Sequence, residues 1–153
     1  YYIIRKNSVV LPVMRDIWIN AAKIKFELEK NKKNYHAIRE WASDEKNITY
    51  THLKSDDEKY TFLEFKASTK VPSVKREMII TYLLRFDFNK RSVEYSISDF
   101  YIDEIEMTLD DWYEKYKTTD RKRVKRNVKF VTEGLDANMK LMISSFTDEI
   151  TSK

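Results

Sequence analysis

The feature that most constrains this sequence is a stretch at residues 80–102, ITYLLRFDFNKRSVEYSISDFYI, in which apolar and polar residues alternate on both sides of a short polar turn. Alternation with a period of two puts successive side chains on opposite faces of a β-strand. The stretch therefore predicts an antiparallel hairpin that packs one face on a hydrophobic core. The core-facing residues of its first strand would be Ile80, Tyr82, Leu84, Phe86 and Phe88.

The alternation changes phase near the end of the second strand. The apolar series occupies odd positions up to Ile97 and even positions from Phe100 onward. An extra residue in one strand moves the side chains that follow it to the opposite face. The sequence thus predicts a β-bulge or a strand end at Asp99.

The chain before this hairpin predicts a strand, a helix and three further strands. After a strand at the run SVVL, apolar residues recur every three or four positions between Met14 and Leu28, which is typical of an amphipathic helix. Segments 35–41 and 47–53 are rich in aromatic and β-branched residues and predict an early hairpin. A similar run at 60–67 predicts one more strand.

The chain after the hairpin predicts two helices. Thr108, followed three residues later by Asp111, resembles a capping box and predicts the start of a short helix at 109–116. From about Asp120 onward, apolar residues at helical spacing predict a helix of about 30 residues. Gly134, the only glycine of the chain, would destabilise this helix by about 1 kcal/mol unless it marks a close contact or a kink.

Together these elements predict an α+β fold in one domain that spans residues 1–153. The sequence has no internal repeat, low-complexity tract or Pro/Gly/Ser-rich linker, and a chain of this length buries about two-thirds of its unfolded surface. We expect a single antiparallel sheet of about five to six strands. The helix at 14–28 and the long C-terminal helix would pack on the same face of that sheet.

The same order of elements resembles a bacterial domain family of unknown function with a TATA-box-binding-protein-like fold, found mainly in Bacteroides-type secreted or envelope proteins. The likeness rests on IWINAAKIKF, AIREWASDEKNITY and the hairpin at 80–102, and it covers about residues 8–105. Asn89 and Lys90 stand where members often have Gly, and Asn tolerates the left-handed backbone of such a turn. The resemblance implies a periplasmic or secreted location and no assigned activity, and the fold alone does not imply DNA binding.

The composition excludes several classes of enzyme. A single Gly rules out the phosphate loop, the dinucleotide fingerprint and the nucleophile elbow, which need at least two glycines at fixed spacing. There is no Cys, and only His36 and His52 are available for a serine triad or a metal centre. These histidines would face each other if the early hairpin paired Ile38 with Tyr50, but no third ligand is evident. We therefore expect a non-enzymatic protein with no catalytic residue, metal or cofactor.

The one positive signal for a ligand is a basic cluster, RKRVKRNVK, at residues 121–129. It contains six cations and no acid, whereas the whole chain, with 29 basic and 25 acidic residues, has a net charge of only +4. Such a cluster could bind phosphate or an acidic partner, although the helix macrodipole disfavours cations near an N-terminus. The alternative is a solvated helix face neutralised by the acidic segment 103–114. The cluster consists of Arg121, Lys122, Arg123, Lys125, Arg126 and Lys129.

Trp41 is a second candidate, as an exposed aromatic platform near the turn of the early hairpin. An exposed aromatic ring there would suit a carbohydrate or a peptide. Trp18, which lies at helical spacing among apolar residues, is instead predicted to belong to the core.

We predict a non-enzymatic secreted or cell-envelope domain that binds a protein, a glycan or another surface ligand, or that has a structural role. Two alternatives stay open: a helix-grip domain that holds an apolar small ligand between the sheet and the C-terminal helix, and an anion- or nucleic-acid-binding module. Nucleic acid is the less favoured partner. A buried pocket above about 300 Å³ between the sheet and residues 124–150 would favour the helix-grip alternative, and a filled interface would favour the binding module.

Two features bear on location. No apolar run reaches the roughly 18 residues of a membrane-spanning helix. Because the chain starts with Tyr1 and not Met, we expect that a preceding segment, such as a signal peptide, has been removed.

Overall fold

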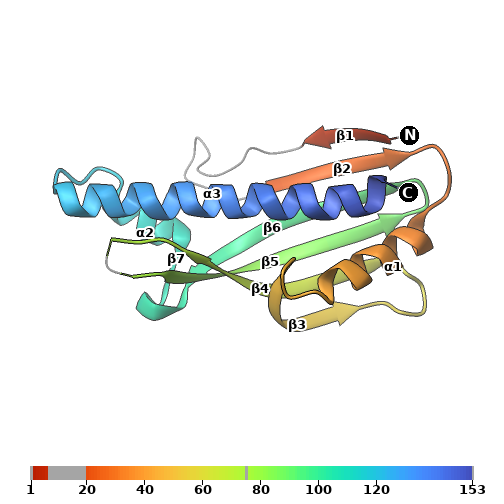
Figure 1. The fold of residues 1–153 in the computed structure, drawn as a ribbon, viewed down its shortest axis with the longest axis horizontal. Helices are drawn as coiled ribbons and strands as arrows, with labels where there is room; N and C mark the ends of the chain where they lie inside the picture. The colour runs from red at the N-terminus through yellow and green to blue at the C-terminus, as the bar shows by residue number, and fades with distance from the viewer. Residues whose placement is uncertain (1, 7–19, 75, 153) are drawn as a thin grey trace.

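The structure, a computed structural model, describes residues 2–6, 20–74 and 76–152 (Figure 1). None of the helices in these ranges combines the length and the apolar character needed to cross a bilayer. Trp18 lies outside the described residues. The elements, in chain order, are β1 (Tyr2–Lys6), β2 (Asn20–Phe26), α1 (Asn31–Ala42), β3 (Thr49–Ser55), β4 (Phe62–Val71), β5 (Met78–Asn89), β6 (Ser92–Ile102), a short 3-10 helix η1 (Asp103–Ile105), β7 (Met107–Thr108), α2 (Leu109–Tyr116) and α3 (Lys122–Thr151).

The strands form one antiparallel sheet in the order β1-β2-β6-β5-β4-β3, and the two-residue strand β7 pairs with the end of β6. Helices α1 and α3 lie on the same face of this sheet (Figure 1). The predicted α+β class, with one antiparallel sheet and a long C-terminal helix, is therefore confirmed. The helix that shares the covered face with α3 is α1, however, and not the predicted helix at 14–28.

The hairpin of β5 and β6 forms as predicted. Its buried side chains alternate along both strands, and Phe86 lies opposite Tyr95 in the ladder. The pairing register shifts by one residue between Thr81 and Leu83, and Asp99 on the partner strand has a φ of 57°, in the left-handed region. The predicted bulge at Asp99 is thus confirmed, and it returns Phe100 to the core.

The predicted helix at 14–28 is wrong over residues 20–26, which form β2; its earlier part lies outside the described residues. Ala22, Ile24 and Phe26 are buried, and the residues between them are half-buried. A helical stripe would bury Ala21, Ile24 and Leu28, so only Ile24 fits both periods, and Leu28 is in fact 69% exposed. This segment forms a strand because its backbone pairs with β1 on one side and with β6 on the other.

The predicted strand at 35–41 is also wrong, because this segment lies within α1. The buried residues of α1 recur at intervals of three and four and are Asn34, Tyr35, Ile38, Trp41 and Ala42. That spacing outweighs the β propensity of the aromatic residues, since it lets one helical face pack on the sheet. The predicted approach of His36 to His52 is lost as well, because His36 is on α1 and His52 is on β3.

Helix α3 is held on the sheet by aromatic packing near its C-terminal end. Phe146 contacts Phe86 and Tyr95 with ring centroids 4.9 Å apart in each pair, and Trp41 of α1 at 5.6 Å. The interface between α3 and the central strands is therefore filled by side chains. The buried stripe of α3 consists of Val131, Leu135, Met139, Met142, Phe146 and Ile150.

Gly134 marks the second point at which α3 is held. A Cβ atom built at Gly134 would lie 2.6 Å from Cδ of Pro72 and 3.5 Å from Cβ of Val71. The glycine thus lets α3 approach the end of β4, which confirms the predicted close contact.

The first prediction concerns this contact. In an open helix Gly→Ala adds about 1 kcal/mol of stability, but Gly134→Ala should destabilise the protein by about 1–3 kcal/mol, because the added methyl group overlaps the rigid proline ring. Urea unfolding measures the change. The double variant Gly134→Ala/Pro72→Ala should recover most of the loss, and a stabilised single variant would show that the helix does not pack this closely.

The second prediction concerns pH. Burial raises the pKa of Tyr95 to about 12, and burial also raises the pKa of Tyr82, from the ordinary value of 10.0. The unfolded chain would ionise these phenols near pH 10 while the folded chain keeps them protonated, so stability present below pH 10 is lost as the pH rises toward 12. Tyr95→Phe should make this loss smaller between pH 10 and 12, measured by urea unfolding. Tyr50→Phe, at a site 37% exposed, is the control and should follow the wild type.

Candidate anion-binding site

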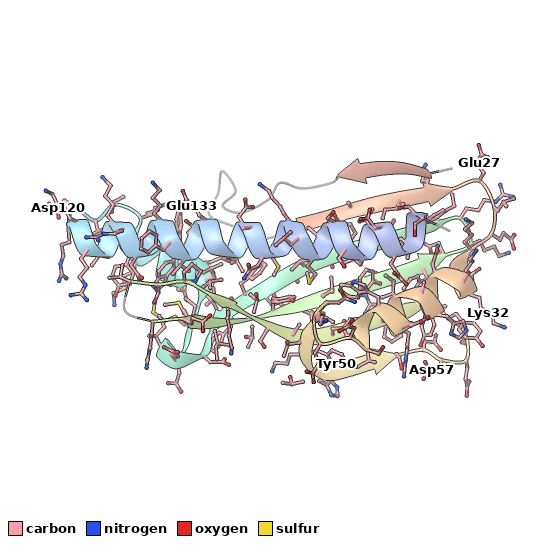
Figure 2. All side chains as sticks on the ribbon, in the orientation of Figure 1. Glu27, Lys32, Tyr50, Asp57, Asp120 and Glu133 are labelled. Atoms are coloured by element: carbon pink, nitrogen blue, oxygen red, sulfur yellow. The ribbon has the colours of Figure 1, made fainter. Side chains whose placement is uncertain are left out.

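The basic cluster lies at the N-terminal end of α3, which reaches past the ends of the strands, above α2 (Figure 1). All six of its side chains are exposed. Figure 2 shows nitrogen-tipped side chains that project above and below the helix around Asp120. None of the six forms an ion pair with another residue in the described ranges.

The acidic segment 103–114 does not neutralise the cluster by direct pairing within the described part of the chain. Glu104 accepts from Arg76 at 2.9 Å, and Glu114 pairs with Lys117 at 2.9 Å. The cations of the cluster are consequently left to solvent or to a ligand.

The helix divides the cluster into two groups. An α-helix turns about 100° per residue, so side chains three, four or seven positions apart share a face. Lys122, Lys125, Arg126 and Lys129 form one stripe, centred about 120° around the helix from the buried residues of α3, and we call it the outer stripe. Arg121 and Arg123 fall on either side of the buried face, and both border a hollow beneath the helix. The structure thus brings two of the six candidates to one site.

This hollow, which we call the end hollow, has a volume of about 480 Å³ and lies between the first turns of α3, the β4–β5 connection, η1 and α2. Its apolar lining residues are Val74, Met78, Ile105, Trp112, Val124 and Val128, and the half-buried ring of Tyr116 lines it as well. Its charged lining residues are three arginines, Arg76, Arg121 and Arg123, and one acid, Glu104, so the described lining carries a net charge of +3 − 1 = +2.

Side-chain contacts fix the walls of the end hollow. The Oδ1 atom of Asn127 on α3 accepts from the backbone N–H of Val74 at 2.9 Å and so ties the β4–β5 connection to the helix. Trp112 is only 3% exposed and anchors α2. At the start of α2, Oγ1 of Thr108 accepts from the N–H of Asp111 at 3.1 Å, which confirms the predicted cap.

The two helix starts at this end differ in their electrostatics. Helix α2 begins with a side-chain cap and with Asp110 and Asp111 in its first turn, whereas α3 has neither a side-chain cap nor an acid there. The positive end of the α3 macrodipole therefore adds to the positive charge of the cluster. A bound anion would relieve this repulsion.

The arrangement suits a ligand that is part anion and part apolar. Arg guanidinium groups bind carboxylates and phosphates through two parallel hydrogen bonds. Beneath them, Met78, Val124 and Val128 offer apolar surface, and Ile105 at the rim is 43% exposed.

The prediction that Trp41 is an exposed platform is wrong. Trp41 is 3% exposed, and its Nε1 atom donates to Oγ of Ser145 on α3 at 2.9 Å. It lies on the buried face of α1, so its ring joins the aromatic packing around Phe146. The spacing of Ile38, Trp41 and Ala42 was the signal that could have shown this.

A larger hollow, of about 650 Å³, lies beside α3 at the β3 edge of the sheet, and we call it the edge hollow. Its volume exceeds the value that favours the helix-grip alternative, but Glu45, Lys46, Lys70 and Leu141 in its walls are exposed. It therefore opens to solvent at the sheet edge and is not a buried cavity, whereas around Phe146 aromatic rings fill the interface of α3 with the central strands.

Sequence reasoning missed Arg76, Trp112 and Asn127 as parts of the end hollow. Asn127 stands inside the basic cluster, where its position beside Arg123 could have drawn attention. Arg76 and Trp112 reach the site only through the β4–β5 connection and α2, so no local pattern links them to the cluster.

Comparison with known proteins supports the fold alone. A TBP-like protein from Parabacteroides distasonis ATCC 8503 superposes with a TM-score of 0.60 at 13% sequence identity, covering 90% of this chain and 97% of that chain. No protein-family model matches the sequence, and no curated protein matches it. The TBP-like fold expected from the resemblance is thus confirmed.

The third prediction tests the electrostatics of the α3 start. Lys122→Glu should stabilise the protein by about 0.3–1 kcal/mol at low salt, because it places an acid in the first turn. Lys129→Glu makes the same charge change beyond the first turns, where the macrodipole has little effect, and should leave stability almost unchanged. Thermal unfolding at low and high salt measures both, and equal shifts would show that the helix start has no special repulsion.

Proposed function

We propose that this protein is a non-enzymatic binding module that holds an anionic partner at the end hollow. The observation that carries the proposal is the convergence of Arg121 and Arg123 with Arg76, which Glu104 already pairs, around an apolar floor. Arg76 follows β4, and the other two begin α3, so the tertiary fold assembles the site. Glu104 is the one acid among the described residues that line it.

The partner that fits is a protein segment with acidic side chains next to an apolar one. The acidic groups would pair with Arg121 and Arg123, and the apolar side chain would enter against Val124 and Val128. The outer stripe adds attraction over a distance of about 10 Å at 0.1 M salt. It would increase the rate of encounter more than it would strengthen the final contact.

Two observations weigh against nucleic acid as the partner. Single strands bind by stacking bases on exposed aromatic rings, but of the two rings that line the end hollow Trp112 is buried and Tyr116 is half-buried. On the sheet face opposite α1 and α3, Arg85 pairs with Glu64 and Asp87 at 3.0 Å each. Cations that are already paired release little free energy by binding phosphates.

The helix-grip function has less support, because aromatic rings fill the space between α3 and the central strands around Phe146, and the edge hollow is open to solvent. We propose that the protein has no enzymatic activity, and the shortage of Gly, Cys and His in the sequence supports this part of the proposal. The periplasmic or secreted location implied by the family resemblance stays a prediction, with a partner at the cell envelope.

The fourth prediction tests the site. A fluorescein-labelled peptide of alternating Glu and Leu should bind at low salt and weaken as salt rises, since part of the attraction is screened. Arg121→Glu/Arg123→Glu should weaken binding at least about tenfold, or 1.4 kcal/mol. Fluorescence anisotropy measures the affinity, and an unlabelled oligothymidylate serves as the competing nucleic acid.

Lys122→Glu/Lys129→Glu is the matched control, since it changes the charge equally in the outer stripe of the same helix. We expect it to weaken binding less than about threefold. Equal losses in both variants would mean that the overall positive field, and not the end hollow, attracts the peptide. No binding at the lowest salt would rule out the proposed function, and displacement by oligothymidylate at equal concentration would favour nucleic acid.

A further inference from the structure

The edge hollow lies at the place where β4 continues beyond the first residue of β3, its neighbouring strand. Strand β4 pairs with β5 as far as Val71 opposite Met78, but it pairs with β3 only as far as Ser68 opposite Thr49. Among the strands that the structure describes, residues 69–71 of β4 therefore have a neighbour on one side only. The walls of the edge hollow include this part of β4 together with Asn47, where the chain enters β3.

The backbone of β4 directs hydrogen-bonding groups into this gap. The carbonyl of Thr61 accepts from the N–H of Phe88 next to β5, and the carbonyl of Phe62 accepts from the N–H of Asp56 next to β3. In β4, the backbone N–H and C=O groups of odd-numbered residues therefore point toward β5, and those of even-numbered residues point toward β3. The β4–β5 register is unbroken to its end. The N–H and C=O of Lys70 consequently point away from β5 and toward the edge hollow.

A side chain already takes one of these two groups. Asn138 of α3 donates through Nδ2 to the Lys70 carbonyl at 2.8 Å and to Oγ1 of Thr69 at 2.9 Å. Its amide stands where the N–H of a further strand would stand. A polar side chain that covers a strand edge in this way also limits uncontrolled pairing between molecules.

The walls of the edge hollow lie on both faces of the sheet. Tyr82, Met139 and Met142 line it from the helix-covered side, and the Tyr82 hydroxyl donates to the sulfur of Met142, a weak acceptor, at 3.2 Å. Ile79 of β5 lines it from the opposite face of the sheet, the one that α1 and α3 do not cover. Leu141 at the rim is 72% exposed. Since the side chains of a strand point alternately to the two faces, these walls suit an added strand.

We propose that the edge hollow binds a short extended peptide from another protein as an added strand in line with β3. The peptide residue opposite Lys70 would exchange both backbone hydrogen bonds with it, after the Asn138 amide moves aside. Its neighbours would place apolar side chains against Met139 and Met142, whose flexible thioethers adapt to different shapes. The rim carries two positive charges, Lys46 and Lys70, and one negative charge, Glu45. This excess of positive charge favours an acidic peptide side chain opposite Lys70.

This site is independent of the end hollow, because the two share no lining residue. An apolar small molecule fits less well, since it would cover the Tyr82 hydroxyl and the Lys70 N–H without supplying partners, which costs about 1–3 kcal/mol for each buried group.

The fifth prediction uses the peptide acetyl-Thr-Val-Glu-Val-Thr-amide and the ¹⁵N-labelled full chain. The peptide should shift the amide signal of Lys70 and slow its hydrogen exchange. Methylation of the backbone nitrogen of the central Glu should weaken binding at least about tenfold, because it removes the donor to the Lys70 carbonyl. Methylation of both Val nitrogens, which point away from β4, should change affinity less than about threefold.

Two variants complete the test. Asn138→Ala should bind the peptide about fivefold more tightly, because the side chain no longer competes for the Lys70 carbonyl. Lys70→Pro removes the edge N–H at a position where β5 needs none, so it should fold but lose binding; an unchanged thermal midpoint checks the folding.

Several outcomes would overturn the proposal. One is a Lys70 signal that does not respond to millimolar peptide, and another is equal binding of the two methylated peptides, which would indicate apolar capture without strand pairing. Weaker binding by Asn138→Ala would show that this residue builds the hollow and does not cover an edge. Lys70 shifts on dilution of the free protein would point to a second copy of the chain. Arg121→Glu/Arg123→Glu should leave peptide binding intact, so failure here is distinct from failure at the end hollow.

Discussion

The packing of Phe146 against Phe86, Tyr95 and Trp41 is the interaction on which the rest of the structure depends. It joins α3, the two central strands and α1 through one ring, with centroid separations of 4.9–5.6 Å. Edge-to-face ring pairs of this kind contribute about 0.5–1.5 kcal/mol each beyond their buried area. Because α1 and the C-terminal half of α3 meet there, the position of that ring determines how the long helix crosses the sheet.

The close contact of Gly134 with Pro72 provides the second fixed point and sets where the support for α3 ends. N-terminal to it, the helix reaches past the strands and rests on α2 and the β4–β5 connection. Side chains in this part of α3 need not fill a core, so cations can remain unpaired there. The basic cluster is thus compatible with the fold because it lies beyond the region that packing controls, and the long, continuously packed remainder of α3 offsets the unfavourable charges at its start.

The sequence was informative wherever one pattern excluded its rivals. The period of two in β5 and β6, the phase change at Asp99, the Thr108 cap and the stripe of α3 each predicted a local structure that formed. The residues of β2 and α1 were assigned wrongly because local spacing and propensity did not separate helix from strand there, and pairing or packing with distant segments decided between the two. At the site, the charge run was visible in the sequence, but the hollow beside it was not, since Arg76 and Trp112 join it only through the tertiary fold.

The two hollows have a common origin, because the long helix α3 packs on a twisted β-sheet. Strands rotate by about 20–25° from one to the next, so a helix of 30 residues cannot follow the sheet along its whole length. Where α3 and the central strands fit, aromatic rings fill the interface. Where the sheet turns away, at the β3 edge and at the N-terminal end of the helix, space remains and the side chains around it differ. At the helix start this space is bordered by arginines and at the sheet edge by backbone and thioether groups, so one packing mismatch produces two surfaces of different chemistry.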